Sequence, residues 1–514
     1  MKPFSIATAL LGLVSGALVS GAAETPSHSR SAVLPADFKP PQVWKNANLV
    51  HIISLEKNYA KEQINVIIEN AASEPQDEYY LPFNADQFSR IGAFEVNDRK
   101  DAAAGPFVAE AVEYDPLRFV SSSPWFPSGA VWLTDTTSNV QYFRIRLPAP
   151  LKPGGQQTLG ISYYYLKAYE PLPASIDQND KQYLHYEFSL YSPSAYTTSK
   201  QKTEIKAGSA TIPDYTQIPI PGNGDDVFPT KQGSKLTYGP FGEEPAFTVV
   251  PAGVRVEFNK PVTHVSNLER DIEVSHWGGN IAFEERYTLH HRGANLTNQF
   301  NRVKWAQAQF MNPNTYALKE MRVPLHAGST DAYFTDTIGN VSTSNFRSNK
   351  REASLELRPR YPVFGGWKYP FTIGWNSDAA NLLRKTATGG YVLKVPFLEG
   401  PKQAEGVEYE NIDVRVLLPE GAEKVKLLAD IPETSIVDYS VDLHRTYLDT
   451  IGRTAVHIKA RNLVDDFRDR DLIISYDVSP TVTLRKPLIV FGSMLTVFIG
   501  AWVVGKVQMG ISKA

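Results

Sequence analysis

The side chains that could do acid/base or metal chemistry do not converge on one site. Glu284 and Glu285 are adjacent in a β-rich run, so their side chains leave opposite faces of a strand and cannot share one reacting group. We interpret them as part of a solvated strand edge. Asp469 and Asp471 have the Asp-x-Asp spacing that can hold a divalent cation, but the run of charges around them favours a solvated turn.

Histidine and cysteine chemistry is equally limited. The ten histidines include His264, His276 and the adjacent pair His290 and His291, but no His-Glu-x-x-His zinc motif occurs. The chain has no cysteine, which excludes disulfides, thiolate metal sites and cysteine nucleophiles. The sequence also lacks a Gly-x-Ser-x-Gly elbow and the glycine-rich loops that bind nucleotides. We therefore expect no catalytic residue, no cofactor and no metal site.

The composition is that of a large, nearly neutral, strand-rich protein. Its 514 residues correspond to about three domains of ordinary size. With 52 Lys and Arg against 55 Asp and Glu, the net charge of −3 excludes nucleic-acid binding through a generally basic surface. The 25 Tyr and 25 Phe residues, together with 34 Gly and 36 Pro, favour strands joined by tight turns.

Two apolar segments predict how the chain is placed in a membrane. Residues 1–23 have the pattern of a secretory signal peptide, with a basic residue, an uncharged stretch and small residues before Glu24. Residues 487–505 carry no charge and would span roughly 28 Å as a helix, which predicts a transmembrane helix. Cleavage of the signal would leave residues 24–484 lumenal or extracellular and 506–514 as a short cytosolic tail, in a single-pass type I topology.

The body between these segments has the pattern of β structure. Strands are predicted over 140–147, 158–166, 183–191, 412–418, 455–460 and 472–478, with a hairpin over 272–290 that turns at Gly278-Gly279-Asn280. Residues 296–310 are the best helix candidate. The stretch 218–242 is rich in Pro, Gly and Asp and shows no periodic element, so we place a domain boundary near 240. We predict a mainly β fold class, with two lumenal β-sandwich-like domains over 24–240 and 241–484 and one C-terminal transmembrane helix.

Two Asn-x-Ser/Thr sequons begin at Asn295 and Asn340. Both lie in the part that we expect to be lumenal, where N-glycosylation is possible, and we predict them as glycosylation sites. Without reference to any relative, these features describe a cysteine-free, membrane-anchored β protein, which is more often an interaction component than an enzyme.

Several strings resemble the ribophorin I family, whose members are subunit 1 of the dolichyl-diphosphooligosaccharide–protein glycosyltransferase, or oligosaccharyltransferase, complex. The strings are IEVSHWGGNIAFEE (272–285), DTIGNVSTSN (336–345), LRPRYPVFGGWKYPFTIGWN (357–376), LLPEGAEKV (417–425) and TYLDTIGRTAVHIKARNLVDD (446–466). The agreement is looser in the first half, where it includes Trp44 and Glu78-Tyr79-Tyr80. The resemblance covers essentially the whole mature chain, and the short segment after the expected span is similar to fungal members.

The resemblance implies a non-catalytic subunit of the endoplasmic reticulum membrane, with oligosaccharide transfer carried out by a separate polytopic subunit. That subunit, the small membrane subunits of the complex and nascent acceptor polypeptides are the implied partners. Two alternatives stay open at this point: a free-standing lumenal hydrolase, and a cell-surface adhesion or receptor protein with no link to glycosyl transfer.

Four positions in these strings are candidate contact or structural residues: Trp277, Gly365, Gly366 and Trp367. We expect residues 364–368 to form a turn whose glycines allow a close backbone approach, with Trp367 either contacting a partner or filling the core. In the expected span, Gly492 and Gly500 are small enough to let another helix pack closely.

Overall fold

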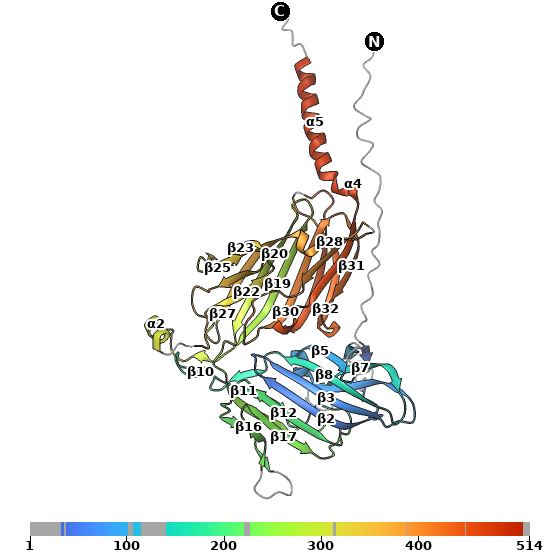
Figure 1. Cartoon of the computed structure of the whole chain (residues 1–514), viewed down its shortest axis with the longest axis vertical. Coiled ribbons are helices and arrows are strands. Elements are labelled where there is room, and N and C mark those ends of the chain that lie inside the picture. Colours follow the sequence, from blue (N-terminus) through green and yellow to red (C-terminus); the bar gives the residue numbers. More distant parts are fainter. Residues whose placement is uncertain are drawn as a thin grey trace, which may run out of the picture. The chain divides into compact units, whose positions relative to one another are not determined.

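Strands form most of the structure, as the sequence predicts. The computed structural model describes residues 32–34, 38–100, 106–114, 140–219, 227–311, 315–387, 389–447 and 449–506. The expected signal peptide and the tail after Lys506 lie outside the described residues. Ser31–Ala514 form one compact unit, within which we call residues 32–257 the N-terminal half and residues 263–478 the C-terminal half (Figure 1).

The N-terminal half is built on a seven-stranded sheet with smaller sheets beside it. The seven strands lie in the order β16 (Thr230–Gln232), β17 (Lys235–Phe241), β12 (Gln201–Ala207), β2 (Trp44–Leu55), β3 (Ala60–Asn70), β8 (Gln156–Tyr165) and β5 (Ile91–Asp98). One four-stranded sheet has the order β13 (Asp214–Tyr215), β18 (Pro251–Glu257), β11 (Tyr183–Ser189) and β9 (Tyr169–Pro171). Another has the order β1 (Ala32–Leu34), β6 (Val108–Tyr114), β7 (Val140–Leu151) and β4 (Gln76–Asn84). The pair β14 (Ile218–Pro219) and β15 (Val227–Phe228) and the short helix α1 (Ala85–Arg90) complete this half.

The C-terminal half is built on an eight-stranded sheet. Its order is β24 (Gly339–Asn340), β23 (Thr330–Asp336), β27 (Lys368–Asp378), β20 (Asn280–His291), β19 (Thr263–Ser275), β30 (Glu408–Glu420), β33 (Arg453–Val464) and β32 (Ile436–His444). A three-stranded sheet has the order β22 (Met321–Leu325), β26 (Ala353–Leu357) and β25 (Asn345–Ser348). A four-stranded sheet has the order β28 (Leu383–Lys385), β29 (Tyr391–Pro396), β34 (Asp471–Val478) and β31 (Ala422–Ala429). The two-residue strands β10 (Ser175–Ile176) and β21 (Asn295–Leu296) pair one half with the other.

Helices are few among the described residues. Besides α1 they are α2 (Arg302–Met311), α3 (Ala379–Leu382), α4 (Pro480–Thr483) and the long α5 (Arg485–Lys506), with the 3-10 turns η3 (Glu433–Ser435) and η4 (Asp465–Phe467). The helix predicted over 296–310 begins later than expected, because Asn295–Leu296 pair as β21 and the side chain of Asn301 accepts hydrogen bonds from the backbone of Val303 and Lys304.

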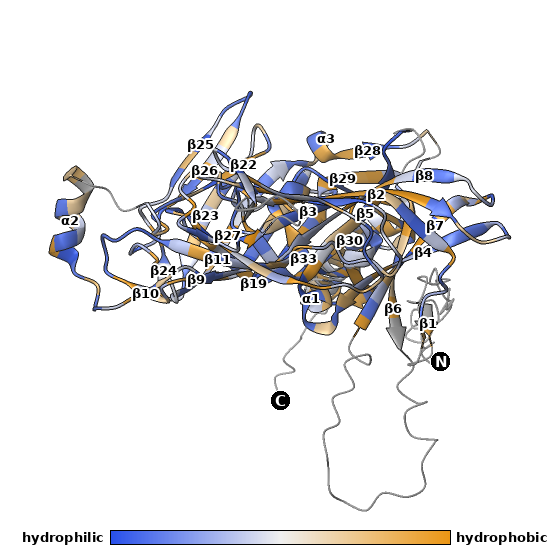
Figure 2. Cartoon of the chain, turned by 90° about the horizontal axis from the view of Figure 1, so that it is seen from below, coloured by the Kyte–Doolittle hydropathy of each residue, from blue (hydrophilic) through white to orange (hydrophobic). Residues whose placement is uncertain are grey.

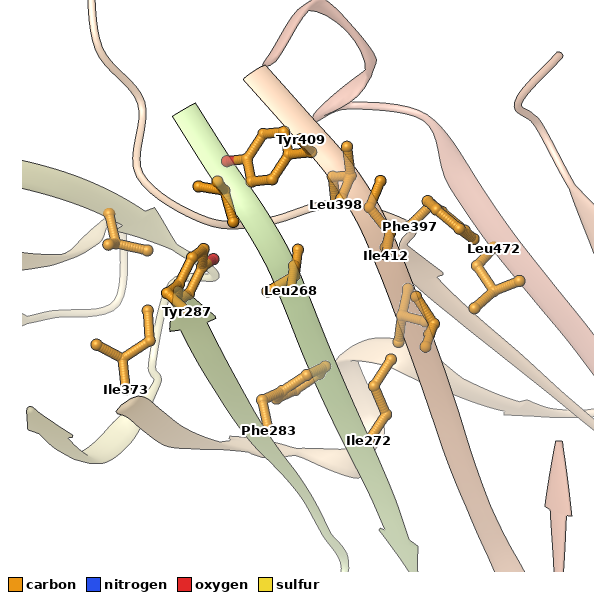
Figure 3. Close-up of a cluster of buried hydrophobic side chains, with 14 of the residues drawn as sticks. Leu268, Ile272, Phe283, Tyr287, Ile373, Phe397, Leu398, Tyr409, Ile412 and Leu472 are labelled. Carbon is orange, nitrogen blue, oxygen red and sulfur yellow. The ribbon is translucent and has the colours of Figure 1, made fainter. Parts of the chain in front are cut away.

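Alternation of side chains explains how the strands of the C-terminal half make a core. Leu268 and Ile272 on β19 point to one face, where Phe283 on the neighbouring strand β20 packs beside them. Leu472 of the smaller sheet belongs to the same buried cluster, so the two sheets pack face to face as a sandwich does (Figure 3). Hydrophobic and hydrophilic residues are interspersed along the strands in the same way elsewhere (Figure 2).

Pairing extends the N-terminal half beyond the expected boundary near 240. The stretch 218–242, in which we expected no regular element, contains β17, a seven-residue strand that pairs with β12 and β16. Next, β18 pairs along its whole length with β11, so Pro251–Glu257 belong to the N-terminal half. The chain changes sheets between Glu257 and Thr263. These strands are stabilised by pairing with strands that are distant in the sequence, so the local pattern alone could not predict them.

Direct bonds join the two halves. The ammonium of Lys57 lies 2.6 Å from a carboxylate oxygen of Asp466, and the hydroxyl of Tyr59 donates to Asp465 at 2.8 Å. On β5, Gly92 lies so close to Asn462 that a Cβ on the glycine would come within 1.7 Å of the asparagine carbonyl oxygen. We call this contact surface the seam. A glycine is required at its tightest point.

Candidate functional site

The two adjacent glutamates of β20 do lie on opposite faces of their strand. Glu285 is fully buried and pairs with Arg270, whose guanidinium also lies 2.8 Å from Glu399. Glu284 faces outward, where Tyr333 donates to it at 2.6 Å and Arg286 pairs with it. The expectation of a solvated strand edge is therefore wrong for Glu285, because β20 is an inner strand of the sheet and one of its faces is core. Both carboxylates hold structural bonds rather than a reacting group.

The histidines also serve separate structural contacts. His264 is buried between two carboxylates, 2.9 Å from Glu408 and 3.0 Å from Glu410. His276 lies 2.9 Å from the hydroxyl of Tyr476. Burial lowers the pKa of His291 to about 4, so this ring is neutral and accepts or donates only within the core. No group of three or more metal-binding side chains gathers among the described residues.

A large cavity lies in the N-terminal half, beside a buried cluster of polar side chains. It measures about 1160 Å³ and is lined by aromatic residues of several strands, among them Phe83, Tyr142, Tyr165 and Phe188. This volume exceeds the 300–1000 Å³ of ordinary small-molecule pockets. Both acidic and basic side chains also line this cavity: Lys39, Asp86, Arg90, Glu170, His185 and Glu187.

Glu62 is the centre of the buried cluster. Its carboxylate accepts hydrogen bonds from the hydroxyls of Tyr163, at 2.7 Å, and Tyr186, and lies 2.8 Å from Nε2 of His51. The four residues come from β2, β3, β8 and β11, so the fold alone brings them together. Burial by itself would raise the pKa of Glu62, but His51 and the two hydroxyls outweigh it and hold the pKa below the ordinary value. Sequence reasoning missed this cluster because its members share no local motif.

The glycines of the string FGGWK allow the close backbone approach that we expected. A Cβ on Gly365 would lie 2.0 Å from the carbonyl oxygen of Ala294, and one on Gly366 would lie 2.1 Å from the side chain of Asn295. Trp367 is half-buried and packs its ring 5.6 Å from that of Phe364 and 6.3 Å from that of Phe300. The ring thus sits within an aromatic cluster of the same chain.

The other singled-out positions are exposed. Trp277 lies at the tip of the β19–β20 hairpin with 67% of its surface accessible. Asn340 lies in β24, just after the turn at Thr337 and Ile338, and Asn295 lies in β21. Both asparagines are exposed, so each sequon is open to modification in the folded chain.

The helix α5 has the length and composition to cross a membrane. It runs over 22 residues with none of its central window buried, and it is the one such helix in the described part of the chain. At 1.5 Å per residue it is about 33 Å long, which matches a hydrocarbon core of about 30 Å. Gly492 and Gly500 have no atom within 4 Å of where a Cβ would stand, so both leave an open notch on the helix.

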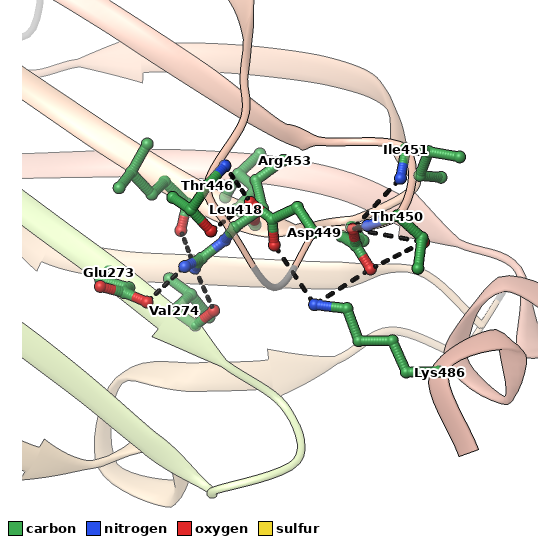
Figure 4. Close-up of polar contacts among 11 residues, drawn as sticks. Glu273, Val274, Leu418, Thr446, Asp449, Thr450, Ile451, Arg453 and Lys486 are labelled. Carbon is green, nitrogen blue, oxygen red and sulfur yellow. Dashed lines mark hydrogen bonds and ion pairs between the residues drawn. The ribbon is translucent and has the colours of Figure 1, made fainter. Parts of the chain in front are cut away.

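A polar cluster holds the first turn of α5 against the C-terminal half (Figure 4). The ammonium of Lys486 lies 3.2 Å from Glu420, at the end of β30, and 3.2 Å from Asp449, in the loop after β32. Asp449 also accepts hydrogen bonds from the backbone and hydroxyl of Thr446, and Glu420 accepts one from the backbone of Thr450. Partial burial would raise the pKa of each carboxylate, but these bonds outweigh it and lower the pKa. We call this cluster the helix anchor.

Comparison with known proteins decides the family. The model of the family described as Ribophorin I matches residues 44–505, which is most of the chain. The chain belongs to the ribophorin I family. Among curated relatives, the dolichyl-diphosphooligosaccharide–protein glycosyltransferase subunit 1 of Caenorhabditis elegans is 29% identical over 462 residues, covering 88% of this chain and 71% of the relative. The protein of the same name from Schizosaccharomyces pombe is 28% identical over 467 residues, covering 90% of this chain and 95% of the relative.

Plant relatives and solved structures add to this comparison. Subunit 1B of the same enzyme from Arabidopsis thaliana is 27% identical over 464 residues, covering 90% of this chain and 93% of the relative. Among solved structures, native yeast LTA4 hydrolase has a TM-score of 0.26 at 10% identity, over 45% of this chain and 32% of that one. A likeness this low carries no argument.

Three of the strings that resemble ribophorin I meet at one end of the eight-stranded sheet. IEVSHWGGN forms the tip of the β19–β20 hairpin, LLPEGAEKV forms the turn between β30 and β31, and TYLDTIGR forms the loop that holds Asp449. These three strings thus gather where α5 begins.

Proposed function

We propose that this chain is an accessory subunit of the oligosaccharyltransferase complex, which transfers a preassembled oligosaccharide from dolichyl diphosphate to Asn of Asn-x-Ser/Thr in nascent proteins. The observation that carries the proposal is the ribophorin I match over residues 44–505, together with curated relatives named as subunit 1 of that transferase. Because these relatives match about 90% of the chain, the assignment rests on the whole body and the helix rather than on one motif.

We place the transfer chemistry in a separate polytopic subunit and give this chain a supporting role. The acidic pair that could have acted as acid and base is divided between two faces of β20, and each member holds an arginine. The chain is then an assembly component whose partners are that catalytic subunit and the small membrane subunits. Their transmembrane helices would pack on the notches at Gly492 and Gly500.

The proposed location is the endoplasmic reticulum membrane, with the bulk of the chain in the lumen and α5 as a single type I span. The apolar, uncharged run within α5 supports the span, and the signal-like pattern of residues 1–23 supports the orientation. Transfer to nascent proteins happens on the lumenal side in this proposal, so the two halves stand where the acceptor passes.

We further assign the presentation of acceptor polypeptide to the aromatic cavity of the N-terminal half. Aromatic walls bind apolar side chains of many shapes, and a rim of mixed charge gives no strong charge selectivity. Val249 also lines this cavity and is 68% exposed.

Val249→Trp should raise KM for a weakly bound acceptor peptide and leave kcat unchanged, because the larger side chain would narrow the cavity. Val303→Trp, at a comparably exposed valine of α2 outside the cavity, is the control and should change neither.

Purification of the tagged full chain in mild detergent tests the proposed function. The preparation is assayed for transfer of a lipid-linked oligosaccharide to an Asn-x-Thr peptide, and its other subunits are identified by mass. Co-purification of transfer activity with a polytopic subunit is expected. An inactive preparation that contains this chain alone, from cells whose transferase is intact, would overturn the assignment.

A further inference from the structure

The register of the eight-stranded sheet shows which of its ends lies near the membrane. β19 and β30 run parallel, with Glu273 opposite Leu417, and β30 ends at Glu420, which holds Lys486 of α5. The tip of the β19–β20 hairpin therefore lies at the end of the sheet from which α5 leaves. Trp277 lies in the turn two residues past Ser275, the last residue of β19, and Glu420 is three residues past Leu417, so both lie beyond that pair at the same end of the sheet.

The loop after β32 emerges at the same end. β32 and β30 both run antiparallel to β33, and His444 at the end of β32 pairs with Arg453, which in turn pairs with Glu420. The helix anchor fixes this loop beside the first turn of α5, because Asp449 binds Lys486. Tyr447, between Thr446 and Asp449, is fully exposed.

Two large aromatic side chains are thus exposed beside the start of a membrane helix. The turn that carries Trp277 is held by its own bonds. In the hairpin, the hydroxyl of Ser275 accepts a hydrogen bond from the backbone of Gly278 at 3.1 Å, and Gly279 has a φ of +60° that closes the turn. Trp277 is 67% exposed. Burying its apolar ring away from water would be favourable by about 2 kcal/mol or more.

The chemistry at this end matches the headgroup region of a bilayer. Trp and Tyr are enriched at that depth because their rings are apolar and their N–H or O–H groups can bond water and headgroups. The exposed Arg485 supplies positive charge at the same level, next to the uncharged run of α5, whereas the charge of Lys486 is balanced by Glu420 and Asp449. Trp502 and Lys506 form a similar aromatic and basic pair at the other end of the helix, with the ammonium 5.6 Å from the ring centre.

We propose that the helix-bearing end of the C-terminal half rests on the membrane surface, with Trp277 and Tyr447 inserted in the headgroup region of the leaflet that α5 enters. The lipid contact would fix the depth and tilt of the whole body relative to the bilayer, in addition to the single tether of α5. The proposal rests on α5 as a span and is independent of the complex to which the chain belongs.

The absence of cysteine gives a direct test, since any introduced cysteine is labelled alone. Full-length Trp277→Cys and Tyr447→Cys variants carry an environment-sensitive fluorophore and are placed in phosphatidylcholine nanodiscs with or without lipid spin-labelled near the headgroup. Phe310→Cys is the matched control: Phe310 is 92% exposed on α2, which follows the opposite end of β20. The same variants in detergent, with the thermal midpoint of each, show that they are folded.

We expect a blue-shifted emission and at least twofold quenching by spin-labelled lipid at positions 277 and 447, and neither at position 310. Equal, water-like spectra at all three positions would overturn the proposal. A blue shift at 277 or 447 without lipid quenching would overturn it as well, since the contact would then be protein rather than lipid.

Discussion

Glu62 is the residue whose replacement we expect to cost most stability. It accepts hydrogen bonds from two tyrosines and lies beside His51, all within the core of the N-terminal half. Glu62→Gln removes the charge and leaves these groups imperfectly paired, which in buried ion pairs costs about 3 kcal/mol or more. Denaturant unfolding of the full chain in detergent measures the loss. Glu170→Gln, at the exposed mouth of the same cavity, is the control and should cost almost nothing.

The pH dependence of this effect has a defined sign. The folded chain holds the pKa of Glu62 below its unfolded value, so the carboxylate contributes stability above the unfolded pKa and loses it as pH falls through the folded one. The difference in unfolding free energy between wild type and Glu62→Gln should therefore be constant from pH 7 to the ordinary carboxylate range and shrink below it. A difference that grows on acidification would contradict this account.

The two sequons give a second prediction at the scale of single residues. Asn295 and Asn340 are exposed, so each should carry a glycan when the chain is made in a secretory pathway. Asn295→Gln and Asn340→Gln should each remove one glycan mass, and the double variant should match the enzymatically deglycosylated chain. Intact-protein mass spectrometry distinguishes one occupied site from two. An unchanged mass in either variant rejects that site.

At the scale of elements, α5 supplies a prediction about assembly. Gly500 leaves an open notch on a helix that has no partner helix within the described chain. Gly500→Leu fills the notch without adding charge, so it should keep membrane insertion and weaken the recovery of other subunits several-fold. Val497→Leu is a suitable control because it changes an already large side chain on the same helix. Quantitative mass spectrometry of the purified complex gives the recovery, and equal recovery of both variants would exclude helix packing at Gly500.

The elements also show what the sequence can and cannot predict. The strand over 472–478 and the hairpin around Gly278 and Gly279 were found from alternation and turn chemistry, and the structure confirms them. β17 and β18 were not found, since their stability comes from pairing with β12 and β11 rather than from local pattern. The Glu62 cluster and the burial of Glu285 were not predicted for the same reason. The sequence of one strand does not show how many strands lie beside it, and therefore does not show which of its faces is buried.

At the scale of the whole molecule, the seam supplies the sharpest steric test. A Cβ on Gly92 would overlap backbone atoms of Asn462, which cannot move without shifting β33. Gly92→Ala should therefore separate the halves and speed proteolysis between Glu257 and Thr263, with each half still folded. Gly242→Ala, where a Cβ meets nothing within 4 Å, is the control. Hydrogen exchange should show the loss confined to the seam, and unchanged protection at Tyr59 and Asn462 would contradict its steric basis.

Because β19 pairs in parallel with β30, which is much later in the sequence, the sheet is completed only after the sequons have been synthesised when the chain is made from its N-terminus. The eight-stranded sheet cannot close until Glu408–Glu420 have been synthesised, and both sequons precede that segment. At about 5 to 20 residues per second, the 68 residues from Asn340 to Glu408 take roughly 3 to 14 seconds. During that interval Asn295 and Asn340 have both been synthesised, while the centre of the eight-stranded sheet, to which the strand of Asn340 belongs, is still missing. Each sequon is therefore available first as part of an unfinished domain, before Lys486 arrives to complete the last contacts.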